Sequence, residues 1–224
     1  MNNICVIIPT YNESKIIVKL VGEIRQLGFD VLVIDDGSND GTGELARNSG
    51  AIVLRNEQKQ GKGASLRKGF AFALQHSYSA IITMDGDGQH DPKDIQQFLK
   101  AAEHNEPCLI VGNRVSDAKG MPLIRWLTNH FMSFLISLIC RQKILDSQCG
   151  FRYLSMDVLK KINLKTEKFE IETEMLVATA KKGFPILSAA IKTIYAGEKS
   201  NINPFVDTLR FIKFLFKQIW TSND

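Results

Sequence analysis

A short acidic turn has the residue types and the spacing of a metal site. The letters DGDGQ occupy positions 85–89, directly after an apolar run. Glycine relaxes the backbone, so the carboxylates of Asp85 and Asp87 can turn toward one ligand. Mg²⁺ and Mn²⁺ prefer oxygen ligands and often use one or two carboxylates together with substrate phosphates. We expect Asp87 and the Gln89 amide oxygen to hold Mg²⁺ or Mn²⁺ with Asp85 assisting, the alternative being a polar turn before a helix.

Two further polar segments have the composition of a nucleotide site. Asp35 and Asp36 follow another apolar run, where a carboxylate can accept hydrogen bonds from a base or a ribose. The letters GKGA at positions 61–64 open an expected helix, whose N-terminus attracts anions and whose glycines allow a close approach of the backbone. Lys62 can therefore meet a phosphate. For each segment taken alone, an ordinary turn is the alternative.

Three arginines lie in or beside apolar segments, namely Arg114, Arg125 and Arg152. Arginine binds phosphate through two parallel N–H bonds, so each is a candidate for binding a phosphate. An arginine at the surface or in a salt bridge is the alternative for any one of them. Asp146 begins the stretch 146–152, where a carboxylate at a turn or a helix end is the simpler interpretation.

Strand-like and helical patterns alternate along most of the chain and must position these residues. Strands are expected at 4–8, 31–34, 51–54, 80–84, 109–111 and 186–195, and helices at 14–26, 42–48, 63–76, 91–103, 122–141 and 171–182. Continuous apolar strands separated by helices predict a mostly parallel sheet covered on both faces. Ligands bind beyond the carboxyl ends of the strands in such sheets. The residues that fall there are Asp35, Asp36, Asp85, Asp87 and Arg114.

The last third of the chain contains two segments with an apolar face. The helix expected at 122–141 has one polar stripe, because four polar residues recur at every fourth position. They are Arg125, Asn129, Ser133 and Ser137. We expect a domain over 1–203, followed at 204–224 by an amphipathic helix that can lie at a membrane interface. Packing of both helices on the core, or in a homo-oligomer, is the alternative.

Composition limits the classes of protein. The net charge of +4, from 28 basic and 24 acidic residues, is too small to indicate nucleic acid but suits anionic substrates or an anionic membrane surface. The four cysteines form no CxxC pair and match no metal template, which favours a reducing compartment. The sequence shows neither a signal peptide nor the ~20 apolar residues of a membrane helix. We therefore expect a cytoplasmic protein that can also bind peripherally at the inner face of the membrane.

Taken in order, these segments resemble the family 2 glycosyltransferases, and most closely the branch that transfers hexoses to polyprenyl or dolichyl phosphate. The resemblance rests on IPTYNE at 8–13, VIDDGS at 33–38 with Gly41 and Thr42, GKGA at 61–64, DGDGQHDP at 85–92, and the stretch 146–152. It extends from residue 4 to about residue 200. The chain lacks the QxxRW motif of processive synthases, which argues against polymer synthesis, and it lacks the C-terminal transmembrane helices of some relatives.

The resemblance implies a fold and roles for the residues above. The fold would be GT-A, an α/β fold with a mostly parallel, Rossmann-like sheet flanked by helices. The nucleotide would be held by Pro9, Tyr11, Glu13 and Asp36 with Asp35 nearby, and we add Lys62 and Asp85. The metal would be held by Asp87 and Gln89. Arg114 and Arg125 take positions that bind the acceptor phosphate in relatives, and we add Arg152. Asp146 takes the position of a catalytic carboxylate, and we place Asp87 beside it in catalysis.

We accordingly expect an inverting, metal-dependent hexosyltransferase with a nucleotide-sugar donor and a polyprenyl-phosphate acceptor. The donor would be of the UDP-glucose or GDP-mannose type, and the stretch 146–152 favours UDP-glucose. A phosphate monoester, with a second pKa near ~6, is already mostly ionised at neutral pH, so Asp146 would only orient groups. A saccharide hydroxyl acceptor, as in cell-surface glycan synthesis, would need a general base. A non-catalytic nucleotide-sugar binder is the third alternative.

Overall fold

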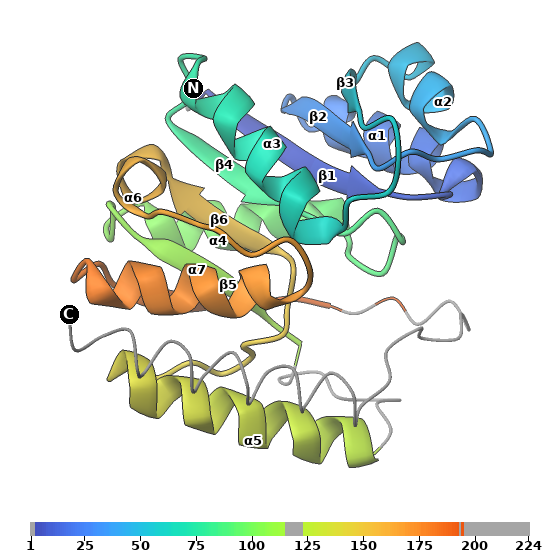
Figure 1. The fold of residues 1–224 in the computed structure, drawn as a ribbon. Coiled ribbons are helices and arrows are strands. Elements are labelled where there is room, and N and C mark those ends of the chain that lie inside the picture. Colours follow the sequence, from blue (N-terminus) through green and yellow to red (C-terminus); the bar gives the residue numbers. More distant parts are fainter. Residues whose placement is uncertain (1–2, 115–122, 193, 195–224) are drawn as a thin grey trace.

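The computed structural model describes residues 3–114, 123–192 and 194 (Figure 1). The segment 204–224, for which an amphipathic helix is expected, lies outside the described residues. None of the described helices combines the length and the apolar character that crossing a bilayer requires. The four cysteines are buried free thiols.

The described strands form one seven-stranded sheet in the order β3-β2-β1-β4-β6-β5-β7. Their bounds are Ile4–Thr10 for β1, Asp30–Asp35 for β2, Ile52–Arg55 for β3, Ala80–Thr83 for β4, Leu109–Asn113 for β5, Arg152–Ser155 for β6 and Ile186–Ala190 for β7. Only β6 runs antiparallel to its neighbours β4 and β5. The mostly parallel sheet predicted from the apolar runs is therefore confirmed.

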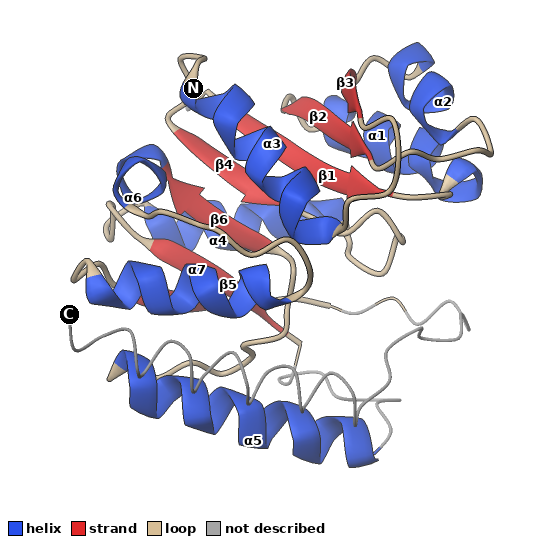
Figure 2. Cartoon of the chain, viewed as in Figure 1, coloured by secondary structure: helices blue, strands red, loops and turns tan. Residues whose placement is uncertain are grey.

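Helices cover both faces of this sheet, as the buried strands require (Figures 1 and 2). Their bounds are Ser14–Gln26 for α1, Thr42–Asn48 for α2, Lys62–Leu74 for α3, Ile95–Ala102 for α4, Leu123–Cys140 for α5, Met156–Lys161 for α6 and Glu170–Lys181 for α7. In the view of Figure 1, α3 and α7 lie in front of the sheet and α4 lies behind it. The long helix α5 lies farther from the sheet and contacts α7.

Local sequence explains where the helices begin and which side they bury. In α1 the buried residues are Ile17, Leu20, Val21 and Ile24, at the three- and four-residue spacing of one helical face. The side chain of Asp91 accepts a hydrogen bond from the Lys93 N–H, and Pro92 begins the short 3-10 turn before α4. This is the predicted helix start, because aspartate pairs with an exposed N–H and proline has none to leave unpaired.

The segment 152–161 is the main departure from the predicted elements. It forms β6 and α6, neither of which was expected. β6 has four residues, begins with an arginine and is buried throughout. It therefore lacks the alternation of apolar and polar residues that would predict a strand. The last strand also ends at Ala190, not at 195.

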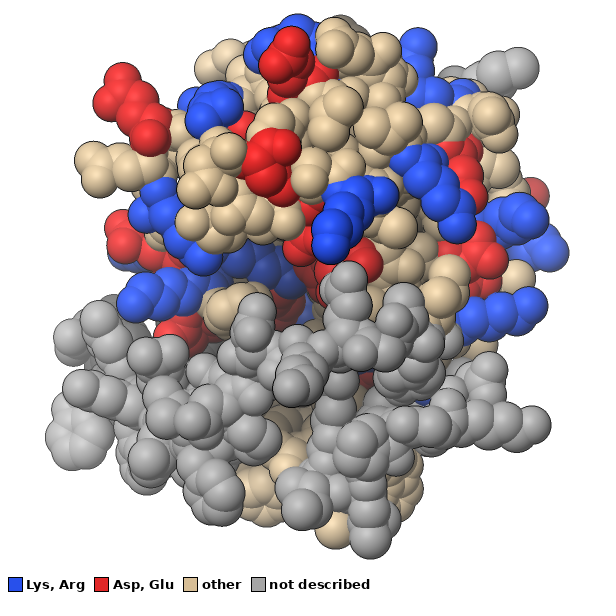
Figure 3. Space-filling model, turned by 90° about the vertical axis from the view of Figure 1, so that its right-hand side faces the viewer, with Lys and Arg blue, Asp and Glu red and all other residues tan. Residues whose placement is uncertain are grey.

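On the face shown in Figure 3, basic and acidic side chains of the described residues are interspersed.

Candidate active site

The polar residues singled out by the sequence meet at the carboxyl ends of the strands. Asp35 is the last residue of β2, Asp85 follows β4 by two residues, and Arg114 follows β5 directly. The Asp36 N–H donates to the Thr10 carbonyl at 2.9 Å, which joins the turn after β2 to the end of β1. The expected edge of the sheet therefore does carry the candidate site.

Asp85 lies in a compact charged cluster. Lys62 Nζ lies 2.5 Å from a carboxylate oxygen of Asp85 and 2.5 Å from one of Glu172, and His90 Nε2 lies 3.7 Å from Asp85. Burial opposes ionisation of both partners, but the two carboxylates raise the pKa of Lys62 and the ammonium lowers the pKa of Asp85. Lys62 therefore contacts Asp85, and both are residues that we expect beside the nucleotide of the sugar donor.

Glu172 was not predicted from the sequence. It lies in the first turn of α7 and is nearly buried, with 5% of the residue exposed. The sequence around it reads EIETE, which spreads three acidic residues around the helix and does not distinguish the buried one. Only its place opposite Lys62 identifies it.

Asp87 faces the charge of Asp85 with few compensating partners. Its Oδ1 accepts a hydrogen bond from the Gln89 N–H at 3.0 Å, while burial and the neighbouring Asp85 charge raise its pKa. No three acidic, histidine or cysteine side chains converge on one point within the described ranges. Oxygen ligands from Asp85, Asp87 and Gln89 still fit Mg²⁺ or Mn²⁺, because these ions take few protein ligands when phosphates supply the rest.

Buried polar atoms without a hydrogen-bond partner gather at the same edge. Within the described part of the chain they include Thr10 Oγ1, His90 Nδ1, Asn129 Oδ1 and Glu172 Oε2, whereas Asp35 Oδ2, which also lacks a hydrogen bond, has an ion-pair partner in Arg55 at 3.5 Å. A buried polar atom without a partner costs roughly 1–3 kcal/mol, so folded proteins rarely keep several in one region. A polar ligand bound along this edge would give these atoms partners.

Asp36 uses its carboxylate on the protein itself. Its oxygens accept hydrogen bonds from Asn56 Nδ2, the Gln60 N–H and the Gly61 N–H, each at 2.8 Å. Asp36 therefore fixes the loop that leads into α3 and presents Lys62. Asp35 is fully buried, and its Oδ1 accepts the Ser38 N–H.

The stability of this loop tests the role of Asp36. Asp36→Ala is expected to lower the free energy of unfolding by roughly 1–3 kcal/mol, because the buried Asn56 amide and two part-buried N–H groups lose their acceptor. Urea denaturation followed by circular dichroism measures the change. Glu57→Ala is the matched control, since Glu57 is an exposed acid in the same loop. Equal stability of the two variants would contradict the assignment.

The glycines of 61–64 let another segment of the chain approach the N-terminus of α3. A Cβ on Gly63 would lie 2.6 Å from the Glu167 carbonyl carbon, and the Ala64 N–H donates to the Glu167 carbonyl at 3.0 Å. The chain's own segment 166–168 therefore packs on the N-terminus of α3. A side chain at position 63 would clash with this backbone, and the expected approach of a phosphate to the same turn stays a prediction.

The remaining nucleotide candidates surround the end of β1. Pro9 is the last but one residue of β1 and pairs with Ile34 of β2. Tyr11 is 37% exposed, and Lys59 Nζ lies 3.7 Å above the centre of its ring. The Glu13 N–H donates to Thr42 Oγ1, which ties the start of α1 to α2.

Arg114 and Asp146 form a buried, two-pronged ion pair. Arg114 Nε and Nη2 donate to the two Asp146 oxygens at 2.8 and 3.0 Å, and Asn129 Nδ2 donates at 3.1 Å. Burial favours the neutral acid, but Arg114 and these hydrogen bonds hold the pKa of Asp146 below its usual value. Asp146 is therefore ionised at neutral pH, and both of its oxygens are already engaged.

The polar stripe predicted on the long helix holds the Asp146 segment in place. Ser133 Oγ accepts the Ser147 N–H at 2.9 Å, and Ser137 Oγ accepts the Ile144 N–H at 3.0 Å. Together with Asn129, these residues anchor the loop after α5. The side chain of Arg125, the fourth member of the stripe, lies outside the described part of the structure.

Arg152, expected at the acceptor, is bonded to the backbone of the protein. Its side chain is fully buried, and its guanidinium donates to the backbone carbonyls of Ser147, Cys149 and Glu172. Those bonds tie the loop before β6 to the start of α7. In this arrangement Arg152 holds the backbone around the site, and its expected contact with the acceptor stays a prediction.

With this geometry established, the family can be assigned. The model of the family described as Glycosyl transferase family 2 matches residues 5–163. The chain therefore belongs to glycosyltransferase family 2 and is a glycosyltransferase. The resemblance drawn from the ordered motifs is confirmed.

Two curated relatives indicate the branch. The chain is 30% identical over 215 residues to the UDP-N-acetylglucosamine–dolichyl-phosphate N-acetylglucosaminyltransferase of Methanococcus voltae, with 86% of each chain covered. It is 30% identical over 200 residues to the undecaprenyl-phosphate mannosyltransferase of Micrococcus luteus, with 83% of this chain and 81% of the relative covered. Both names fit the polyprenyl-phosphate branch predicted from the motifs.

A solved structure supports the fold. Glucosyl-3-phosphoglycerate synthase of Mycobacterium tuberculosis, crystallised with Mn²⁺, UDP and phosphoglyceric acid, matches with a TM-score of 0.70 and 18% identity. The match covers 88% of this chain and 72% of the other. The predicted GT-A fold is therefore confirmed.

Proposed function

We propose that this protein transfers a hexose, with inversion, from a nucleotide sugar to the phosphate of a polyprenyl phosphate, using Mg²⁺ or Mn²⁺. The observation that carries the proposal is the Arg114–Asp146 pair. A guanidinium held by a buried carboxylate, beside the acidic turn of Asp85 and Asp87, offers its remaining N–H to an anion. The names of the two curated relatives support a polyprenyl-phosphate acceptor.

The state of Asp146 favours a phosphate over a hydroxyl as the attacking group. A carboxylate with a lowered pKa and two engaged oxygens is a weak base. A phosphate monoester needs no base, because it is largely ionised above its second pKa of about 6. Asp146 then serves as a positioning residue for Arg114. For a saccharide acceptor, Asp146 would be a poor receiver of the hydroxyl proton.

The donor end of the site suits a nucleoside diphosphate. When bound, Mg²⁺ or Mn²⁺ would supply positive charge opposite the departing diphosphate, held by Asp87 and Gln89 with Asp85. Lys62 keeps Asp85 ionised and oriented for this purpose. Pro9, Tyr11 and Glu13 border the nucleoside, and Asp36 fixes the loop beside it. UDP-glucose is the donor that we propose.

The exposed side of α5 supports the proposal that the domain over 1–203 acts at a membrane surface. The amphipathic helix expected at 204–224 is proposed to bind the same surface. Leu127, Phe131, Phe134 and Leu138 are each more than half exposed and recur at helical spacing. Such a row of large apolar side chains is characteristic of interfacial helices.

Membrane contact can be measured by flotation. The double variant Leu127→Ser, Phe131→Ser is expected to bind anionic phosphatidylglycerol vesicles about tenfold more weakly, because two apolar side chains no longer enter the interface. Val18→Ser is the control, an exposed apolar residue on α1. Vesicle binding by the double variant equal to that of the parent would refute membrane contact through α5.

A donor and acceptor screen tests the proposed function. The protein is incubated with Mg²⁺ or Mn²⁺, one nucleotide sugar at a time, and either a short polyprenyl phosphate or a saccharide. Release of nucleoside diphosphate that requires UDP-glucose and the polyprenyl phosphate is expected. Release only with a saccharide would replace this proposal by the hydroxyl-acceptor alternative, and nucleotide binding without release would favour a non-catalytic binder.

A further inference from the structure

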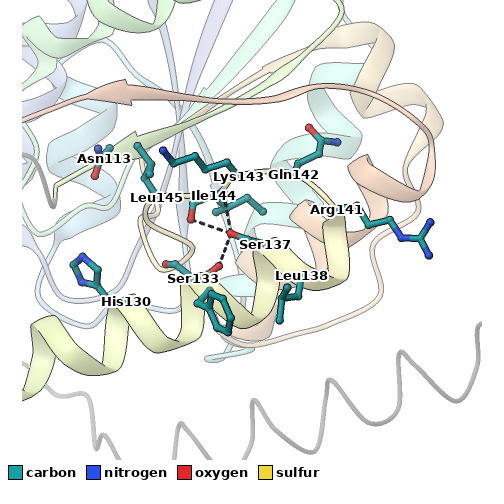
Figure 4. Close-up of a pocket in the computed structure, with 11 residues that line it drawn as sticks. Asn113, His130, Ser133, Ser137, Leu138, Arg141, Gln142, Lys143, Ile144 and Leu145 are labelled. Atoms are coloured by element: carbon teal, nitrogen blue, oxygen red, sulfur yellow. Dashed lines mark hydrogen bonds between the residues drawn. The ribbon is translucent and has the colours of Figure 1, made fainter.

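A cavity beside the long helix is not used by the chemistry above. It measures about 650 Å³ and lies between α5 and the segment 141–145 (Figure 4). Its apolar lining consists of Phe134, Leu138, Ile144 and Leu145. We propose that this groove binds the first isoprene units of the acceptor lipid, an inference that rests on the proposed function and names where the hydrocarbon lies.

The groove presents carbon because its hydroxyl groups are already bonded within the chain. Ser137 Oγ donates to the Ser133 carbonyl at 2.7 Å and accepts the Ile144 N–H at 3.0 Å (Figure 4). Ser133 Oγ accepts the Ser147 N–H. Phe134 and Leu138, in contrast, are 59% and 60% exposed. A hydrocarbon chain bound there would shield these two side chains from water.

The groove begins where the acceptor phosphate would bind. Asn113, which lines one end, is the last residue of β5 and directly precedes Arg114. The segment that forms the groove wall continues into Asp146, the partner of Arg114. A phosphate at Arg114 would therefore place the first carbons of its chain at the Asn113 end of the groove.

The charges around the groove suit an anionic lipid. The cationic side chains in its lining are Arg141 and Lys143, and the described lining contains no carboxylate. Arg141 points away from Asn113, whereas Lys143 lies on the segment that leads to Asp146 (Figure 4). Positive charge on that segment, beside an apolar surface, complements a hydrocarbon chain that ends in a phosphate.

Water-soluble acceptors test the inference without a membrane. We would measure kcat/KM with a five-carbon prenyl phosphate and with its ten-carbon homologue. In the parent protein the longer chain is expected to raise kcat/KM about tenfold, because part of the added isoprene unit is buried. Phe134→Ser and Leu138→Ser are expected to reduce this gain to about threefold or less, with the KM for the donor unchanged.

Phe131→Ser is the matched control. Phe131 lies on the same helix and is 55% exposed, close to the exposure of Phe134, but it does not line the groove. It is expected to keep the full chain-length gain, and circular dichroism verifies that all three variants are folded.

Several results would overturn the inference. It fails if the parent shows no chain-length gain, or if the gain survives in Phe134→Ser and Leu138→Ser. A dimer that becomes monomeric in these variants while the gain is unchanged would assign the groove to a second copy of the chain. Absence of transfer to either prenyl phosphate, with transfer to a saccharide, would instead refute the proposed function.

Discussion

Arg114→Lys is expected to lower kcat/KM for a polyprenyl phosphate by about a hundredfold or more, with the KM for the donor within about twofold of the parent value. Arg114 uses Nε and Nη2 to bind Asp146, which leaves the rest of its planar fork for the acceptor. A lysine ammonium is a single point charge and cannot hold the carboxylate and a phosphate in this geometry. Initial rates with each substrate varied in turn separate the two effects.

Asp146→Asn provides the companion test of how the pair works. The amide keeps the size of the side chain but removes its charge, so Arg114 loses its orientation and kcat/KM falls. With a phosphate acceptor, the rate should rise with pH through about 6, the second pKa of the acceptor, in both proteins. Titration of Asp146 does not change the rate in that pH range, because its lowered pKa leaves the carboxylate ionised well below pH 6. An acidic limb that disappears in Asp146→Asn would show that Asp146 is a general base.

Asp87→Ala is expected to lower transfer by about a thousandfold, the effect of losing one electrostatic contact to the transition state in a site built for it. Asp87 has a raised pKa because it is buried beside the Asp85 charge, and a cation relieves that repulsion. Calorimetric titration with UDP should show that Mn²⁺ strengthens binding to the parent but not to the variant.

A matched variant separates the metal role from a general loss of charge. Asp91→Asn removes a carboxylate from the same loop, yet asparagine also caps a helix start, so activity and Mn²⁺-dependent UDP binding should persist. If Asp87→Ala transferred normally and still required the metal, the ligands would have to lie elsewhere.

Local patterns predicted most of the fold. The helices α1 and α2 begin and end at the expected residues, because apolar spacing and polar boundaries are features of the segments themselves. The antiparallel strand β6 could not be predicted. It is inserted between β4 and β5 and is stabilised by pairing with residues distant in sequence. A four-residue buried strand carries no period of its own.

The candidate site was predicted in outline but not in its internal contacts. We could predict that Asp85, Asp87 and Arg114 lie at one edge of the sheet, because each follows a strand and parallel strands end at the same edge. Residue type alone could not assign partners. Asp36 bonds to a loop of the protein, Arg152 bonds to three carbonyls in the core, and Glu172 joins Lys62 from a distant helix. Each of these depends on tertiary contacts that no short motif encodes.

Product analysis with a single acceptor tests the central claim most directly. The protein, UDP-glucose, Mg²⁺ and a short polyprenyl phosphate are incubated, and the lipid is examined by mass spectrometry beside a reaction with the matching polyprenol, which lacks the phosphate. We expect a lipid heavier by one hexosyl residue only when the phosphate is present, and about a hundredfold less of it, or even less, from Arg114→Lys in the same early time interval. A glycosylated polyprenol, or a product formed equally well by Arg114→Lys, would contradict the central claim.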